Sequence, residues 1–326
     1  MSETLTVAHP ARVDLSFPHA QTTIMTAPAL QGDGQTAQPF DQLIVSWNGQ
    51  TPGAGALEVD VRVASPAGEW SQWFSFGCWS TRASRQSLDD QEDSFGWMST
   101  DTLLLNAPSH AYEYRVTLHD QASISLLALT TSLKEQHQAF LGEAGNPAQW
   151  GRRLDVPLRS QMVHEGGEGW CSPTALSMLL SYHGIEVSVP DAAAGTFDRV
   201  YEGTGNWPFN TAYAATFGLS AFVTRLPSLR VAESFLGAEV PLALSLGWKV
   251  GELDNAPLPS SGGHLVVLVG FDEQGQPVVN DPAAASDADV QRVYDRQQFE
   301  KQWLSRSGGM AYILLPSVQT LDSVEM

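Results

Sequence analysis

The chain has 326 residues and a formal net charge of −19, with 36 acidic and 17 basic side chains and only two cysteines. This acidity disfavours nucleic acid or an anionic membrane surface as a partner, and two cysteines exclude a disulfide framework. No window approaches the roughly 18–20 apolar residues of a membrane helix. The opening MSETLTVAHPARVDLSF lacks the basic and apolar regions of a signal peptide, so we expect a cytoplasmic location.

The first half of the chain is predicted to be all β. Short segments alternate apolar and polar residues, and Gly, Pro, Asn and Asp separate them without intervening helices. This pattern is typical of an antiparallel sandwich. The predicted strands are FDQLIVSWNG (40–49), ALEVDVRVAS (56–65), EWSQWFSFG (69–77), DTLLLN (101–106), AYEYRVTLH (111–119) and SISLLALTTS (123–132).

Five tryptophans crowd this predicted sandwich: Trp47, Trp70, Trp73, Trp79 and Trp97. Such rings either fill a core or domain interface, or they stack on sugars as in carbohydrate-binding modules. Trp70 and Trp73 are an odd number of positions apart on one predicted strand, so at most one of them faces inward. The sequence therefore leaves a ligand of the sandwich open.

The first chemical signal is Cys171, which lies where a loop turns into a helix in GWCSPTALSMLLSYHG (169–184). Pro173 suits a first helical turn, apolar residues recur at helical spacing from Ala175, and Gly184 ends the segment. A thiol at a helix start faces unpaired backbone N–H groups and the positive end of the dipole, which favour the thiolate. The alternative is a buried core cysteine.

The second signal is His264, in GGHLVVLVGFDEQGQPVVNDPAA. The pattern predicts a strand from His264, a turn containing Gly275 and a return strand that ends at Asn280. Folding this hairpin places Asp281 roughly opposite His264. The carboxylate could then hold one ring nitrogen while the other faces a nucleophile. Asn280 is the rival orienting residue, and strand register favours Asp281.

Further candidates lie near these residues. Gln161 precedes Cys171 by ten positions, and its amide could donate to a developing oxyanion together with the Cys171 N–H. We expect three residues to shape the substrate cleft: Trp170, Gly263 and His164. No CxxC pair, HExxH motif or phosphate-binding Gly-Lys loop is present, so we expect no metal and no cofactor.

These motifs, in this order, resemble papain-like cysteine peptidases of the bacteriocin-leader-processing type, and more closely the soluble relatives of that family. The resemblance covers about residues 150–318, although the Gln161–Cys171 interval is longer than usual and contains an apparent HEGGE insertion. No transporter membrane segment follows. The segments that carry the resemblance are VPLRSQ, GWCSPTALSM, YEGTGNWPFNTAYAATFGL (201–219), GGHLVVLVGF, VVNDPAA, YDRQQFEKQWL (294–304) and GGMAYILLP (308–316).

The resemblance implies a cysteine peptidase acting on peptide or protein substrates. It assigns Cys171 as nucleophile, His264 as base, Asp281 as orienting acid and Gln161 as oxyanion donor. The alternatives are an amidase or transferase with the same triad, or an inactive scaffold that binds peptide or carbohydrate. The expected architecture is an antiparallel β-sandwich followed by an α+β papain-like domain. In chain order we expect a loosely ordered arm (1–39), the sandwich (40–132), a linker (133–154), the peptidase-like domain (155–318) and a tail (319–326).

Overall fold

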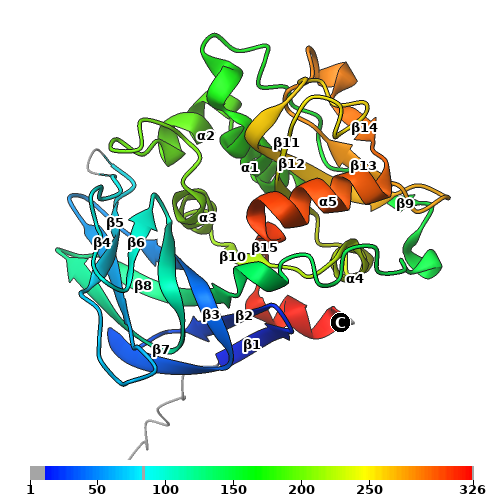
Figure 1. The fold of residues 1–326 in the computed structure, drawn as a ribbon. Helices are drawn as coiled ribbons and strands as arrows, with labels where there is room; N and C mark the ends of the chain where they lie inside the picture. Colours follow the sequence, from blue (N-terminus) through cyan, green and yellow to red (C-terminus); the bar gives the residue numbers. More distant parts are fainter. Residues whose placement is uncertain (1–11, 83–84, 325–326) are drawn as a thin grey trace, which may run out of the picture.

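The computed structural model describes residues 12–82 and 85–324. In this part of the chain two antiparallel sheets lie side by side, and the α-helices all belong to the second half (Figure 1). The strands of the first sheet are β1 (Arg12–Phe17), β2 (Ala20–Thr26), β3 (Gln31–Gln50), β4 (Ala56–Val63), β5 (Phe74–Trp79), β6 (Gly96–Ser99), β7 (Thr102–His119) and β8 (Ser123–Ser132).

The second sheet and the helices follow a connecting stretch. The strands are β9 (Arg152–Arg153), β10 (Ser220–Arg225), β11 (Leu242–Trp248), β12 (Ser261–Phe271), β13 (Pro277–Asn280), β14 (Gln291–Val293) and β15 (Met310–Leu315). The helices are α1 (Cys171–Tyr182), α2 (Val189–Thr196), α3 (Trp207–Ala215), α4 (Leu229–Gly237) and α5 (Arg296–Ser307). None of the helices in the described residues is long and apolar enough to cross a membrane.

The all-β character expected for the first half is confirmed, but the sandwich differs in detail. Its strands form one hydrogen-bonded path, in the order β1-β2-β8-β3-β7-β4-β5, with β6 paired to β7. The predicted strands 101–106 and 111–119 are parts of the single strand β7. The residues around Pro108, which the sequence indicated as a turn, instead form a bulge in β7. At this bulge the register between β7 and β3 shifts, between Phe40 and Gln42 of β3.

The arm expected over residues 1–39 is wrong for residues 12–39, which form β1, β2 and the start of β3; residues 1–11 lie outside the described part. Antiparallel pairing holds these segments in the sheet, β1 on β2, β2 on β8 and the start of β3 on β7, whereas their composition alone indicated a loose arm. The domain limits stay a prediction, because one hydrophobic cluster contains side chains from both halves, including Leu15, Ile24, Phe222 and Leu242.

The second half is built around an antiparallel sheet in the order β10-β15-β11-β12-β13-β14, with β9 on β12. Alternation along the strands gives the sheet two apolar faces. Helices α1, α2 and α3 pack on the face that includes Val267, and α4 and α5 pack on the face that includes Leu268. This matches the antiparallel α+β unit expected from the sequence.

Strand β10 is an edge of the second sheet, and the first sheet covers it. Asn48 donates through Nδ2 to the Ala221 carbonyl at 2.5 Å and accepts the Ala221 N–H at 3.0 Å. Ser46 Oγ accepts the Val223 N–H at 3.0 Å, and Thr130 Oγ1 donates to the Val223 carbonyl at 2.8 Å. Polar side chains of β3 and β8 thus take the place of a neighbouring strand along this edge.

Apolar contacts join the halves beside this edge. The ring of Phe209, at the start of α3, lies 6.1 Å from that of Trp47 and 5.4 Å from that of Trp79, and all three are fully buried. Trp73 instead lies under Arg62 and Arg115, whose guanidinium carbons are 4.8 and 4.5 Å from the ring centroid.

The junction yields a stability prediction. Asn48→Ala leaves the buried N–H and C=O of Ala221 without their partner, and each unsatisfied group costs about 1–3 kcal/mol. We therefore expect the free energy of unfolding to fall by roughly 2–6 kcal/mol in urea titrations. Asn106→Ala is the matched control, because its amide makes an exposed bond of 3.2 Å to Ser94. Equal stability of the two variants would contradict the role given to Asn48.

Candidate active site

Cys171 is the first residue of α1, as expected, with Trp170 at the N-cap. The helix behind it is buried from Ser172 to Leu180, so the sulfur is presented from a rigid central element. Cys171 as a whole residue is half-buried. The backbone N–H groups of Ser172 and Leu265 both point to the sulfur and favour its charged form.

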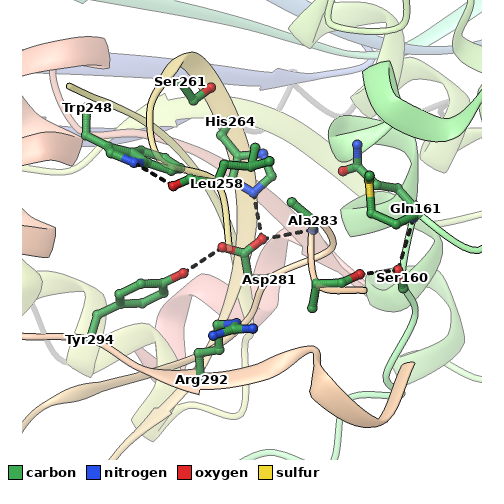
Figure 2. Close-up of polar contacts among 12 residues, drawn as sticks. Ser160, Gln161, Trp248, Leu258, Ser261, His264, Asp281, Ala283, Arg292 and Tyr294 are labelled. Carbon is green, nitrogen blue, oxygen red and sulfur yellow. Dashed lines mark hydrogen bonds and ion pairs between the residues drawn. The ribbon is translucent and has the colours of Figure 1, made fainter. Parts of the chain in front are cut away.

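His264 and Asp281 face each other across the β12–β13 hairpin, as the sequence predicts. Nε2 of His264 lies 2.7 Å from Oδ1 of Asp281, and the two residues are 2% and 0% exposed (Figure 2). Two further donors hold the carboxylate: the Tyr294 hydroxyl at 2.7 Å and the Ala283 N–H at 2.9 Å. The imidazole is therefore held in one orientation, with Nδ1 left for another partner.

Cys171 lines the same cavity as His264, and the interaction between the two side chains shifts the pKa of both. Burial alone would raise the pKa of the Cys171 thiol, but the bond to His264 and its charge bring that pKa below its usual value. Burial would likewise lower the pKa of His264, but the charge and hydrogen bond of Asp281 raise it. The two shifts together favour a thiolate beside an imidazolium.

Asp281 is stabilised as a carboxylate within this arrangement. Burial would raise its pKa, but the charge of His264 and the hydrogen bonds from His264, Tyr294 and Ala283 lower it. Asn280, the rival orienting residue, points elsewhere, because its Nδ2 donates to the Val156 carbonyl at 3.1 Å. The register of the hairpin therefore selects the aspartate.

Gln161 lies close to the loop before Cys171, but its amide is engaged. Nε2 donates to the carbonyls of Gly167 and Glu168 at 2.9 and 2.7 Å, and the buried Oε1 has no partner among the described residues. The backbone N–H of Gln161 bonds the Pro282 carbonyl at 2.8 Å, next to Asp281. The residue thus ties the Cys171 loop to the Asp281 loop.

A cavity of about 650 Å³ opens beside the sulfur and the imidazole. Of the three residues expected to shape the cleft, Gly263 lines it, whereas Trp170 and His164 are not part of its wall; their rings lie 6.4 Å apart in the loop before α1. The residues that line the cavity include Cys171, Tyr201, Thr204, His264, Arg306 and the turn 99–102 of the first sheet.

Sequence reasoning missed two parts of this site. Tyr294 holds Asp281 but lies 13 positions along the chain, and only the pairing of β13 with β14 brings it near. The turn 99–102 reaches the cavity through the packing of the two halves, which no local pattern encodes. Among the described residues no group of three His, Cys, Asp or Glu side chains is placed to hold a metal ion.

Comparison with protein-family models gives two matches. Residues 153–310 match the Peptidase_C39 like family, and residues 2–133 match the Peptidase C39 N-terminal domain. The resemblance noted in the sequence is thereby confirmed. No curated protein matches the chain.

Two solved structures are each similar to about half of the chain. One is the crystal structure of a double glycine motif protease from an AMS/PCAT transporter in complex with the leader peptide, at 19% identity and a TM-score of 0.36, covering 51% of this chain and 94% of that one. The other is that of a putative C39-like peptidase from Bacillus anthracis, at 18% identity and a TM-score of 0.37, covering 49% and 94%.

The electrostatics predict selective labelling of Cys171. Its pKa is lowered, whereas burial and the charge of Glu58 raise the pKa of Cys78. At pH 6 we expect iodoacetamide to modify Cys171 at least about tenfold faster than Cys78, because the thiolate is the reactive form. Peptide mass spectrometry measures both rates.

The matched variant for this experiment is His264→Ala. It removes the two largest influences that oppose the burial of Cys171, so the pKa of the thiol should rise and the labelling at pH 6 should slow markedly. Equal labelling of the two cysteines in the unaltered protein would show that Cys171 is not activated.

Proposed function

We propose that the chain, which belongs to the Peptidase_C39 like family through residues 153–310, is a cysteine peptidase that works through a Cys171–His264–Asp281 triad. The observation that carries this proposal is the buried hydrogen bond between His264 and Asp281, with His264 and Cys171 both at the wall of one cavity. A nucleophile, a base and an orienting group thus lie together at one site, as nucleophilic catalysis requires.

In the proposed reaction the Cys171 thiolate attacks a peptide carbonyl in the cavity. The C–N bond breaks as His264 protonates the leaving amine, which leaves a thioester on the sulfur. Water then attacks the thioester while His264 accepts its proton, and the thiolate is released with the carboxylic acid. Asp281 stabilises the imidazolium throughout, and Tyr294 holds Asp281 in place.

The oxyanion that forms in each step needs donors. Cys171 is the first residue of α1, so its backbone N–H has no acceptor within the helix and faces outward at the positive end of the dipole. We propose this N–H as the first donor. Gln161 is proposed as the second, and it would have to exchange its bonds to the Gly167 and Glu168 carbonyls for one to the substrate.

The proposed substrate is a peptide or protein, with no nucleic acid or membrane surface as partner of a chain of charge −19. An amidase or transferase would use the same triad. Of the five tryptophans of the first sheet, Trp47 and Trp79 are core residues and Arg62 and Arg115 lie against the Trp73 ring, so only the exposed Trp70 and Trp97 leave carbohydrate binding as an alternative.

Removal of either reacting group should abolish turnover. We expect Cys171→Ala and His264→Ala each to eliminate hydrolysis of a fluorogenic peptide library, and the double variant to be no worse than either, because the two act as one unit. Unchanged melting temperatures are the control for folding. Hydrolysis that survives Cys171→Ala would show that the nucleophile lies elsewhere.

The supporting residues should have graded effects. Asp281→Asn should slow hydrolysis without abolishing it, because an amide oxygen still accepts the imidazole N–H but stabilises imidazolium less. Tyr294→Phe, which removes one bond to the same carboxylate, should cost less still. Gln161→Ala should reduce kcat by about 10²–10³ if its amide reaches the oxyanion. A normal kcat in Gln161→Ala would show that Gln161 holds its loop in place and does not donate to the oxyanion.

A further inference from the structure

The turn that joins β6 to β7 belongs to the first sheet but reaches the cavity of the second half. Its four residues, 99–102, line the same cavity as Cys171 and His264. The loop 201–205 of the second half lines this cavity as well. One wall of the site is therefore built jointly by the two halves of the chain.

Asp101 connects these two parts of the wall. It is only 7% exposed, and its Oδ2 accepts the backbone N–H of Trp207, the first residue of α3, at 2.6 Å. Its other oxygen accepts the Thr102 hydroxyl at 3.1 Å. A carboxylate at a helix N-terminus is favoured by the dipole. Through this bond the first sheet holds the end of the loop 201–205 in place.

The beginning of the same loop is held by the first sheet as well. Arg85 donates to the carbonyls of Ala194 and Phe197 at 2.6 and 3.0 Å. The backbone N–H of Ser87 donates to Asp198 at 2.9 Å. Contacts with the first half therefore flank the cavity-lining part of the loop on both sides along the chain.

Thr100, at the tip of the turn, has a costly backbone conformation. Its φ is 56°, and the Asp101 N–H bonds the Ser99 carbonyl at 2.7 Å, which makes a tight three-residue turn with positive φ at its centre. A β-branched residue is strongly disfavoured there, and glycine would be the default. A strained residue on a cavity wall indicates that its side chain has a use there.

The cavity leaves room for a substrate peptide beside two glycines. A Cβ atom at Gly169 or at Gly263 would meet no atom within 4 Å, so a substrate backbone has open space beside both the Cys171 loop and His264. Ser99 and Thr100 also line the cavity and carry hydroxyl groups that can pair with peptide N–H and C=O groups, whereas the Thr204 hydroxyl already donates to the Gly169 carbonyl at 3.1 Å.

We propose that the turn 99–102 is part of the substrate site, and that the substrate is an extended, polar peptide segment reaching from Cys171 to Thr100. Thr100 contacts this peptide and determines specificity, whereas Asp101 is a positioning residue that couples the turn to α3. The proposal rests on the proposed peptidase function, because it assumes that Cys171 attacks the bound chain. A small amide substrate would not need this wall.

The test compares long and short probes of the same thiol in the full chain. The long probe is a pool of tetrapeptidyl chloromethyl ketones with Ser, Thr, Gln or Lys at the outer positions and alanine next to the reactive group. The short probe is acetyl-alanyl chloromethyl ketone. Mass spectrometry gives the inactivation rate at Cys171 for each, and iodoacetamide gives the reactivity of the thiol alone. The ratio of the long-probe rate to the short-probe rate is the readout.

We expect Asp101→Ala to reduce this ratio about tenfold, because a displaced positioning element weakens transition-state contacts at a distance. Asp101→Asn should restore it to within about twofold, since an amide oxygen still accepts the Trp207 N–H. Asp93→Ala is the matched control: Asp93 also accepts backbone N–H groups, from Phe95 and Gln72 at 2.8 and 2.9 Å, but it does not line the cavity. The iodoacetamide rate should be unchanged in all three.

Thr100→Gly separates substrate contact from folding. Glycine removes the strain, so the melting temperature should rise, while the ratio should fall through loss of the side chain. An unchanged ratio in both Asp101→Ala and Thr100→Gly, with Cys171 still reactive, would overturn this inference and leave the proposed function standing. If Cys171 resists every electrophile, the proposed function fails and the inference fails with it.

Discussion

The outer edge of β10 presents backbone N–H and C=O groups that no strand of its own sheet can pair, and it is buried against the other half of the chain. Groups of this kind must find partners. Asn48, Ser46 and Thr130 supply them from strands of the first sheet. Since such bonds tolerate little displacement, they set the position of one half on the other, and the remaining features of the site depend on that placement.

The buried polar groups of the candidate active site are likewise provided with hydrogen-bond partners. Asp281 is fully buried, yet each of its oxygens has a donor: His264 and Ala283 on one, and Tyr294 on the other. A buried charge is tolerable only when it is paired and hydrogen-bonded in this way. The carboxylate in turn raises the pKa of the imidazole, and the imidazole lowers the pKa of the Cys171 thiol, so the charge state of the sulfur depends on a hairpin distant along the chain.

The residues that could be predicted from sequence are those whose neighbours are local. Cys171 at a helix start and the His264–Asp281 pair across one hairpin follow from periodicity and turn chemistry. The parts that could not be predicted depend on long-range packing. The strands of residues 12–39 depend on pairing with the distant strands β8 and β7, and the contact of Asp101 with Trp207 links positions 106 residues apart. No window along the chain contains that information.

The covered edge of β10 also has a consequence for how the protein is made. The side chains that satisfy it come from residues synthesised 93 to 177 positions earlier, so the first sheet is complete before β10 leaves the ribosome. The edge of β10 can therefore pack against the first sheet as soon as it is synthesised. A chain deprived of the first sheet would instead offer a bare, apolar-flanked strand edge, which is a template for strand addition by a second copy and hence for aggregation.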